Sequence, residues 1–581
     1  MTAELVQAAL TAPAHRRVRR RVFRQLVESL VYEGALKTRL EGDVHHVDGA
    51  DEAGAPVTYS FSAVRRFGFG RIGLTSPVRR GQVEADSVTR FLTEVRGSLD
   101  ADPELLPGFA REIEETLFKD TLAEHLRTAP DPAMGYDELE SAITDGHRYH
   151  PTYKSRMGFD TADNIAYGPE FGNAVRPLWL AAHRSITEVT ASKSLEPAQL
   201  AESLGADAVR FQRILEDSGL DPEDYALVPV HPWQWRERLA RAFSAQLATG
   251  ELVPLGEDPH EFRAQQSIRT LSCRDRPERP YLKLSMSIVN TSTGRGLAAH
   301  TVRNAAPITD WLREVVASDE YLRDELRPVL LGEELGVAVT PESGLLREDT
   351  YGALACIWRE SLHPHLGEGE SAMPFTGLTS SDDGDLLIGP WLREHGAERW
   401  VRQLTRVAAL PLVHLLCKHG IALETHAQNA VLLHRDGLPS RVVLKDFHDG
   451  VRFSRAHLAD PQRCPQLAAT PAHHTNRNSF VETADPGLVT DFLLDAFFFI
   501  NFGELAIALD EVLPERRFWQ LVAEEIRAYQ QRFAELAERF ELFDVFTPTI
   551  EVEKLTTRRL RPDTELRLHT AANPLAEVSG C

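Results

Sequence analysis

The segment of residues 424–450, ETHAQNAVLLHRDGLPSRVVLKDFHDG, constrains this chain more than any other stretch. The apolar runs AVLLH and RVVLKDF flank a turn at 435–437 and predict a β-hairpin. Glu424 and Asn429 precede the hairpin, and Asp446 ends it. Carboxylate and amide oxygens are the ligands that Mg²⁺ prefers, together with substrate phosphates. The segment therefore predicts a hairpin that holds Mg²⁺ and a nucleotide; a hairpin with ordinary turn residues is the alternative.

A second polar stretch, residues 266–295, predicts an anion site. Its SIRT sequence offers the hydroxyls of Ser267 and Thr270 and the guanidinium of Arg269. The run YLKLSMSIVN alternates as a strand, with Lys283 on its polar face, where it can reach a phosphate as a point charge. Arg295 follows between two glycines, which allow close approach of the backbone to a ligand. The alternative is that Lys283 is simply solvated on an open sheet face.

A third stretch, DGHRYHPTYKSRMGF at 145–159, places His147, His150, Lys154 and Arg156 in a loop punctuated by glycine and proline. Loops with so many polar donors are poor core material and good anion sites. Anion or substrate binding is therefore favoured. Metal binding by the two histidines and a plain surface loop are the alternatives.

A fourth stretch, VPVHPWQWRER at 228–238, combines aromatic bulk with an imidazole. Structural packing is the default interpretation, and lining of a pocket is the alternative.

The arginines of the predicted helix at 15–33 also allow two interpretations. A solvated face paired with acidic neighbours is favoured there over a nucleic-acid patch.

Charge and cysteine usage narrow the function classes. The net charge is −22, which argues against nucleic acid and anionic membranes as partners. Five scattered cysteines without a CxxC pair are typical of a reducing compartment. The most apolar stretch, 492–513, is interrupted by polar and charged residues such as Asp495 and Glu504. It therefore predicts a buried helix and no membrane span.

Hydrophobic periodicity gives a coarse order of elements. Helical patterns are found at 15–33, 85–145, 170–190, 196–217, 398–419 and 486–540. Strand patterns are found at 41–75, 225–230, 280–290 and in the hairpin 430–447. Residues 363–390 are rich in Gly, Ser, Pro and Asp and predict a long loop at a boundary.

Five separated motifs carry a family resemblance: HRYHPTYKSRMGF, VPVHPWQW, SIRTLS, KLSMSIVNTSTGRGL, and ETHAQNAVLL followed by LKDF. In this order they closely resemble the NRPS-independent siderophore (NIS) synthetases, the IucA/IucC-like family. The resemblance implies an α+β, three-lobed protein. Its thumb (1–145) is helical with a small sheet, its fingers (146–385) hold the ATP-phosphate and substrate contacts, and its palm (386–581) is distantly kinase-like. It further implies a cytoplasmic enzyme that is often a homodimer.

The same resemblance assigns roles residue by residue. Arg295, His426 and Lys283 are expected to be catalytic, with Arg295 between the α-phosphate of ATP and the carboxylate substrate. ATP is expected to contact Lys154, Ser155, Ser267, Arg269, Thr270, Lys283 and Gln428. The carboxylate is expected to contact His150, Arg156, Arg295 and His426. Mg²⁺ is expected at Glu424, Asn429 and Asp446. Arg148 departs from the family, which usually has proline there.

The implied reaction is adenylation of a carboxylate by Mg·ATP with release of pyrophosphate. An amine, hydroxylamine or alcohol then displaces AMP. Citrate or a citryl derivative is the favoured carboxylate, and succinyl-hydroxamate chemistry in the same family is an alternative. The order Asn, hairpin, Asp-Phe also resembles protein kinases, so a phosphotransferase that releases ADP is a further alternative. The polar stretches at 145–159, 266–295 and 424–450 contain no G-x-G-x-x-G loop, and the chain has no Walker A sequence, so a standard kinase is not favoured.

Overall fold

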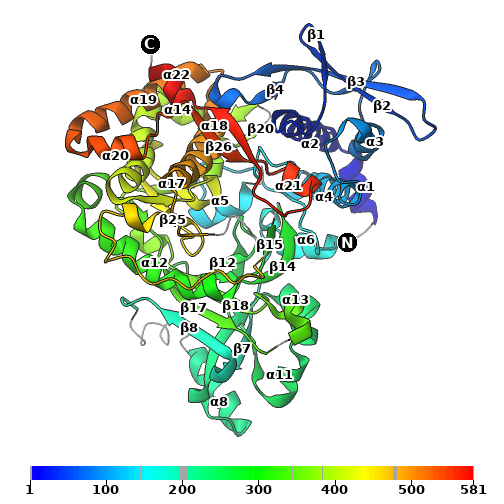
Figure 1. Cartoon of the computed structure of the whole chain (residues 1–581). Helices are drawn as coiled ribbons and strands as arrows, with labels where there is room; N and C mark the ends of the chain where they lie inside the picture. Colours follow the sequence, from blue (N-terminus) through cyan, green and yellow to red (C-terminus); the bar gives the residue numbers. More distant parts are fainter. Residues whose placement is uncertain are drawn as a thin grey trace.

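The computed structural model describes residues 3–143, 146–195, 206–291, 293–342, 344–382, 384–474 and 480–579. It mixes helices and sheets throughout, as the α+β prediction requires. Figure 1 shows the blue N-terminal segment at the upper right, the cyan and green middle of the chain below, and the orange and red C-terminal helices at the upper left. These three regions converge on the centre of the molecule. Their assignment to thumb, fingers and palm stays a prediction.

The N-terminal region packs two long helices against a small antiparallel sheet. Helix α2 (Pro13–Tyr32) confirms the helix predicted at 15–33, and it packs along α4 (Leu106–Leu126) around a core that includes Val22 and Leu26. Arg20 pairs with Glu84, which confirms a solvated arginine face matched to acidic neighbours. The strands are β1 (Arg39–Glu41), β2 (Val44–Ala50), β3 (Pro56–Arg65), β4 (Ile72–Leu74), β5 (Arg79–Arg80) and β6 (Val83–Glu84).

The middle of the chain contains a larger and a smaller sheet that carry most of its strands. The larger has the order β11-β12-β13-β18-β17-β8, and helix α12 (Ala299–Ser318) packs on β17; the smaller has the order β10-β7-β9. The larger sheet comprises β8 (Thr187–Ala191), β11 (Phe262–Ala264), β12 (Thr270–Cys273), β13 (Tyr281–Leu284), β17 (Glu333–Val339) and β18 (Ala355–Arg359). The smaller comprises β7 (Leu178–His183), β9 (Tyr225–Val230) and β10 (Leu252–Glu257).

The helix predicted at 170–190 is wrong. That range holds the short turn η3 (Pro169–Phe171) followed by β7 and the start of β8. Trp179, Leu180, Ala181 and Ala182 are consecutive buried residues, because β7 is the central strand of its sheet. A short apolar run of this kind fits a buried strand and a buried helix equally well by periodicity. Helix α8 (Ala206–Asp217) confirms the second part of the helix predicted at 196–217, whose residues 196–205 lie outside the described ranges.

The C-terminal region contains the predicted hairpin. A helical run from α15 (Ala397–Leu404) to η12 (Leu415–His419) ends at Gly420, as predicted for 398–419. Strands β23 (Ala430–Arg435) and β24 (Leu438–Leu444) then pair antiparallel, and their turn residues Asp436 and Gly437 both have positive φ. Asp–Gly suits this turn, because its mirror-image geometry requires positive φ at both central positions.

The hairpin lies in a four-stranded sheet with the order β16-β24-β23-β19. β16 (Val329–Leu330) is parallel to β24, and β19 (Ser371–Pro374) is antiparallel to β23. The sheet thus takes strands from both sides of residue 385. The prediction of a loop at 363–390 is partly wrong, because β19 lies within this range and is buried against the hairpin.

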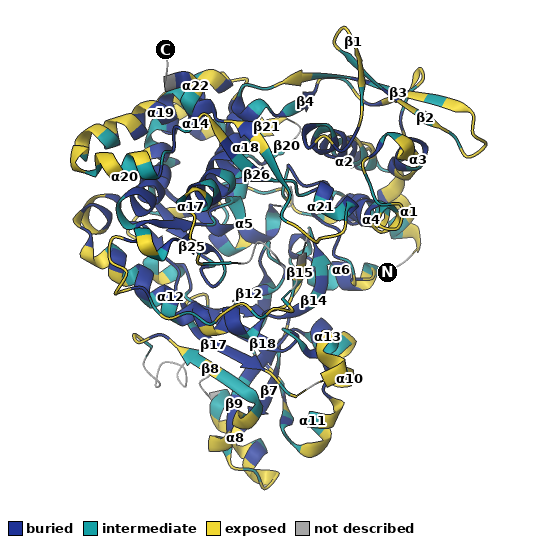
Figure 2. Ribbon diagram, in the orientation of Figure 1, coloured by how far each residue is buried: buried dark blue, intermediate teal, exposed yellow. Residues whose placement is uncertain are grey.

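The apolar stretch near the C-terminus is an interior helix, as predicted. α17 (Pro486–Leu493), η15 (Leu494–Phe502) and α18 (Gly503–Leu509) form one run. By length and composition this run, alone among the described residues, could cross a membrane, but 72% of its apolar window is buried inside the protein. Figure 2 shows that exposed residues gather instead on outer elements such as α19 (Glu515–Arg532), α20 (Ala537–Leu542) and the β2–β3 hairpin.

Candidate functional site

A polar cavity of about 350 Å³ brings together segments that are far apart in the sequence. Its walls come from the loop at 146–156, the end of β14 (Met286–Asn290) with Thr291, Arg295, the loop at 424–428, the run 492–504 and the end of β26 (Thr549–Glu553). The predicted residues that line it are His150, Lys154, Arg156, Arg295, Glu424, His426 and Gln428. The predicted residues that do not line it are Ser155, Ser267, Arg269, Thr270, Lys283, Asn429 and Asp446.

In this second group, Arg269 and Asn429 hydrogen-bond the backbone of Arg295 and Glu424 in the first, and Lys283 pairs with Asp446. Lys283 on β13 lies 3.0 Å (Nζ to Oδ2) from Asp446, which follows β24. Arg359 on β18 lies 2.7 Å (Nη1 to Oδ1) from the same carboxylate. Burial opposes ionisation of Asp446, but Lys283 and Arg359 outweigh it and hold the pKa well below its usual range. The solvated alternative for Lys283 is wrong, since its side chain is 3% exposed.

Arg269 positions the backbone that carries Arg295. Its Nη1 donates to the carbonyls of Arg295 (2.8 Å) and Gly296 (2.9 Å), at the end of β15 (Thr293–Arg295). Arg295 donates Nη2 to the hydroxyl of Thr291, whereas its buried Nε has no partner among the described residues. Burial, and then the charge of Arg269, lower the pKa of Arg295 to about 10. Two adjacent cations with few carboxylate contacts form a favourable place for an anion.

Ser267 and Thr270 stabilise the strand start beside Lys283. The hydroxyl of Ser267 accepts from the backbone N–H of Thr270 at 3.1 Å, and Thr270 faces Lys283 across the β12–β13 ladder. The buried hydroxyl of Thr270 has no partner within the described ranges.

Lys154 and Arg156 are already paired with buried carboxylates. Lys154 Nζ lies 2.5 Å from Asp120 Oδ1, and Arg156 makes a bidentate pair with Glu170 at 2.8 and 2.9 Å. Their positive charge is therefore largely balanced within the protein, which the sequence did not reveal. Ser155 between them is fully buried, and its hydroxyl has no partner in the described part of the chain.

The histidines of the cavity are uncharged near neutral pH. Burial lowers the pKa of His147 to about 4 and that of His426 to about 3, and it holds the pKa of His150 well below its ordinary value. His150 bonds Thr152 through Nδ1 (3.1 Å) and leaves Nε2 without a described partner. Arg148 lines the cavity and donates to the carbonyl of Thr379.

The loop before the hairpin is held by backbone contacts. Glu424 N–H donates to Gly450 C=O (2.8 Å), and Asn429 Nδ2 donates to Glu424 C=O (2.9 Å). Burial, and then Asp449, raise the pKa of the Glu424 carboxyl to about 7. Glu424 and Asn429 thus lie just before β23, and Asp446 lies just after β24, at the open end of the hairpin. This donor set suits Mg²⁺.

The cavity also has an acidic wall, which the sequence motifs did not predict. Asp495 on η15, Glu504 on α18 and Glu553 on β26 all line it. The sequence does mark Asp495 and Glu504, because they interrupt an apolar helix where charge is costly. Their presence argues against a membrane span and is also consistent with a polar wall. No sequence pattern marks Glu553, since its strand reaches the cavity only through tertiary packing.

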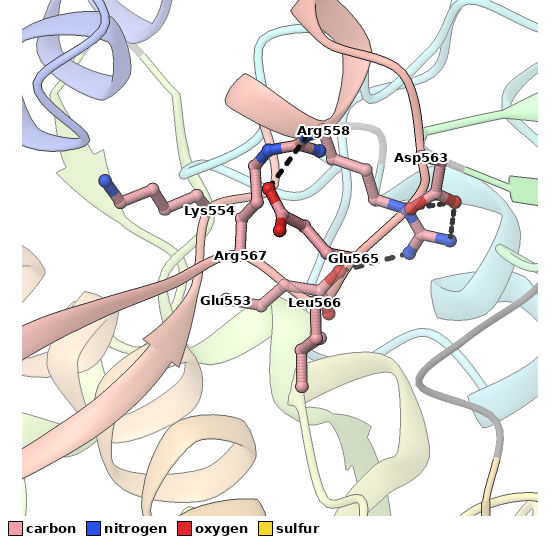
Figure 3. Close-up of a pocket in the computed structure, with 7 residues that line it drawn as sticks. All are labelled: Glu553, Lys554, Arg558, Asp563, Glu565, Leu566 and Arg567. Atoms are coloured by element: carbon pink, nitrogen blue, oxygen red, sulfur yellow. Dashed lines mark hydrogen bonds and ion pairs between the residues drawn. The ribbon is translucent and has the colours of Figure 1, made fainter.

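Arg558 on α21 (Thr557–Leu560) closes the wall beside Glu553. Figure 3 shows Arg558 between Glu553 and Asp563, and its nitrogens lie 3.1 Å and 3.0 Å from these carboxylates. Arg558 and Glu553 line both the main cavity and the small neighbouring pocket in Figure 3.

The 228–238 stretch is structural, as the default interpretation held. Trp233 packs with Phe159, Ile268 and Met286 in a core cluster, and its Nε1 donates to Asp163 (3.1 Å). His231 is fully buried and caps the helix that follows it.

Two family models match this chain. Residues 135–380 match the IucA / IucC family, and residues 398–568 match a family described as ferric iron reductase FhuF-like transporter. A citryl-spermidine/3,4-dihydroxybenzoyl-citryl-spermidine:spermidine ligase from Bacillus anthracis is 40% identical over 578 residues, covering 96% of this chain and 93% of the relative.

Two further likenesses extend over the whole length. A 2-[(L-alanin-3-ylcarbamoyl)methyl]-3-(2-aminoethylcarbamoyl)-2-hydroxypropanoate synthase from Staphylococcus aureus is 42% identical, with 96% of this chain and 93% of the relative covered. The crystal structure of the petrobactin biosynthesis protein AsbB from Bacillus anthracis superposes with a TM-score of 0.92 at 38% identity, covering 100% of this chain and 99% of the other. This chain therefore belongs to the IucA/IucC family and is an enzyme of the NIS synthetase type.

Proposed function

We propose that this enzyme adenylates a citrate-type carboxylate with Mg·ATP and condenses the acyl-adenylate with an amine. The observation that carries the proposal is the cavity itself, in which Arg295 and two neutral histidines, His150 and His426, line the same space. A carboxylate has to approach the α-phosphate of ATP there although both are anions. A guanidinium that no carboxylate of the described residues pairs with can hold both.

Arg295 is assigned to the centre at which the adenylyl group is transferred to the carboxylate. In the first step a carboxylate oxygen attacks the α-phosphorus, an O–P bond forms, and pyrophosphate leaves with the electrons of the broken P–O bond. Negative charge on the phosphoryl oxygens is greatest in the transition state, so a preorganised guanidinium stabilises it more than the ground state. His426, being neutral, can donate one N–H to an oxygen of the substrate carboxylate without adding charge.

The neighbouring cluster is assigned to the nucleotide. Arg269, which donates to the backbone of Arg295, and Lys283, which pairs with Asp446, would provide positive charge toward the ATP phosphates. Lys154, Ser155, Ser267, Thr270 and Gln428 are proposed to complete the nucleotide contacts. Glu424, Asn429 and Asp446 would hold Mg²⁺, which offsets phosphate charge when bound.

The carboxylate is proposed to be citrate or a citryl derivative. Support comes from the relative that is named a citryl-spermidine ligase and matches nearly the whole chain. In the second step the amine nitrogen attacks the acyl carbon, the C–N bond forms, and AMP leaves. A homodimer is proposed on the family resemblance alone.

A hydroxylamine-trapping assay tests the function. The enzyme is incubated with ATP, Mg²⁺, hydroxylamine and one of a panel of carboxylates including citrate and succinate, and AMP, ADP and hydroxamate are quantified. We expect hydroxamate and AMP in equal amounts with a citrate-type acid. ADP as the product would support the phosphotransferase alternative, and absence of hydroxamate with every acid would contradict the proposal.

A further inference from the structure

We propose that Asp319, His414 and His419 form a Zn²⁺ site that lies apart from the central cavity and joins the middle of the chain to the C-terminal helices. None of these three residues lines the cavity. The ion would hold the two regions together and would take no part in the proposed adenylation.

The three ligand atoms converge on one point. Nε2 of His414 and Nε2 of His419 lie 3.1 and 3.0 Å from Oδ2 of Asp319, and the three atoms lie within 4.8 Å of one another. Zn²⁺ sits about 2.0–2.1 Å from nitrogen and oxygen donors, which places tetrahedral ligands about 3.4 Å apart. Small side-chain movements therefore suffice to admit the ion. Two imidazoles and a carboxylate are also a donor set that suits Zn²⁺.

The backbone register brings the two histidines to the same face. His414 ends α16 (Leu410–His414), and His419 ends η12, five residues later. On an α-helix, side chains five residues apart point about 140° away from each other. η12 is a π-helical turn, whose wider winding returns the chain to the same face after five residues. Such turns are frequent at functional sites. The spacing therefore makes a ligand pair only because the helix departs from α geometry here.

Hydrogen bonds to outer partners orient two of the ligands. Oδ1 of Asp319 accepts from the backbone N–H of Leu322 at 3.0 Å, which leaves Oδ2 to face the histidines. Nδ1 of His414 is hydrogen-bonded to the hydroxyl of Tyr529 at 2.9 Å, which leaves Nε2 to face Asp319. The side chains of Asp319 and His414 are both fully buried. Metal-binding histidines and carboxylates are commonly held in this way, so the site is preorganised.

Lys418 supplies the cation of the site when no metal is bound. Its Nζ lies 2.7 Å from Oδ2 of Asp319, the oxygen that also faces both histidines. The side chain of Lys418 is 40% exposed and its stem is flexible, so it can turn out into solvent. His419 is the partly exposed ligand, at 14%, and water on this side can complete four ligands. The ammonium and Zn²⁺ therefore compete for one carboxylate oxygen.

The site connects two regions of the fold. Asp319 directly follows α12, which packs on β17 of the larger middle sheet, whereas both histidines belong to the helical run before the hairpin. An ion held by ligands from both regions binds the folded chain and not the unfolded one. Zn²⁺ should therefore raise the unfolding temperature as its concentration rises.

The first test compares His419→Gln with the matched control His125→Gln, which changes an exposed histidine. Each protein is freed of metal with a chelator and dialysed. Zn²⁺ is then titrated against a chromophoric chelator, with Mg²⁺ in excess to occupy the site proposed for the nucleotide metal. We expect one tightly bound Zn²⁺ per wild-type chain. In His419→Gln the affinity should fall roughly 10²-fold or more, since loss of an outer partner alone costs about 10–100-fold. The control should bind Zn²⁺ as the wild type does.

The second test uses Lys418→Met, which removes the competing ammonium and keeps the length of the side chain. We expect this variant to bind Zn²⁺ roughly threefold more tightly, because the metal no longer displaces an ion pair. A network that serves only as an ion pair would instead lose stability and show no gain in Zn²⁺ affinity.

The outcomes that would overturn the site are specific. They are absence of a tightly bound Zn²⁺ in the wild type, or equal Zn²⁺ affinities of the wild type and a folded His419→Gln protein, with folding checked by circular dichroism. If His419→Gln does not fold, Lys418→Met decides, and unchanged or weaker Zn²⁺ binding by that variant would overturn the site. The titrations contain no substrate, so their result is independent of the hydroxylamine-trapping assay.

Discussion

Lys283 and Asp446 meet at 3.0 Å, although Lys283 lies on β13 and Asp446 follows β24, a strand of a different sheet. Lys283 is proposed to bind the phosphates of ATP, and Asp446 is proposed to bind Mg²⁺. In the free enzyme the two side chains pair with each other instead. Nucleotide binding would exchange this ion pair for contacts of each residue with the ligand. The pair also explains how both charges are tolerated in a buried position, since an isolated buried charge is costly.

Lys283→Ala should weaken both nucleotide binding and catalysis. Loss of the ammonium removes a phosphate contact, and it leaves Asp446 with Arg359 as its remaining close cation. We expect kcat/KM for ATP to fall roughly 10²-fold, by analogy with the loss of one charge-stabilising donor. Steady-state AMP release measures this. Lys193→Ala is the control, because Lys193 is 81% exposed and pairs with Glu314 at the surface.

Arg295→Ala should affect the chemical step most. We expect kcat/KM for the carboxylate to fall about 10²–10³-fold, because we propose that this guanidinium lies between two anions that repel each other. Arg303→Ala is the control, since Arg303 follows on α12 and pairs with Glu188 at the surface. Near-normal hydroxamate formation by the Arg295→Ala enzyme would remove Arg295 from this role.

Local signals explain what the sequence predicted well. The hairpin was predictable because its turn chemistry and its alternation lie within one short segment, and Asp446 follows it directly. Glu424 and Asn429 lie in the same short segment, and their role as Mg²⁺ ligands stays a prediction. The order of motifs then supplied the family, which the comparisons confirmed.

The features that the sequence did not predict depend on residues that meet only in the tertiary structure. Arg359, which shares Asp446 with Lys283, lies on another strand, and Asp120 and Glu170 balance Lys154 and Arg156 from α4 and η3. Nothing within the motifs indicates these pairs. The strand β7 was mistaken for a helix because burial on both faces removes alternation.

Asp319→Asn should destabilise the fold. Asp319 Oδ2 accepts from His414 (3.1 Å), His419 (3.0 Å) and Lys418 (2.7 Å) inside the C-terminal core. Burial alone would raise its pKa, but these bonds lower it far below its ordinary value. The ionised carboxylate of Asp319 therefore stabilises the fold fully above about pH 4, and this stabilisation is lost as the pH falls below that value.

Urea unfolding at pH 7 measures the size of this effect. We expect the free energy of unfolding to fall by about 3 kcal/mol, as when one partner of a buried charged network is removed. Asp324→Asn is the control, because Asp324 is an exposed carboxylate on the next helical turn that pairs with Arg323. Equal unfolding midpoints for both variants would contradict a structural role for the Asp319 network.

His231 should make the fold sensitive to mild acid. Burial, and then Arg236, lower its pKa in the folded protein to about 3, whereas an unfolded histidine has a pKa near 6.5. The contribution of the neutral ring to the free energy of unfolding is therefore complete above pH 6.5, and it is lost as the pH falls below that value. At pH 5 the loss is about 2 kcal/mol. His231→Asn keeps the cap on Trp233 and should show a smaller drop in unfolding free energy between pH 7.5 and pH 5. His125→Gln, at an exposed position, should retain the wild-type drop, and an equal drop in all three proteins would show that His231 is not the titrating group.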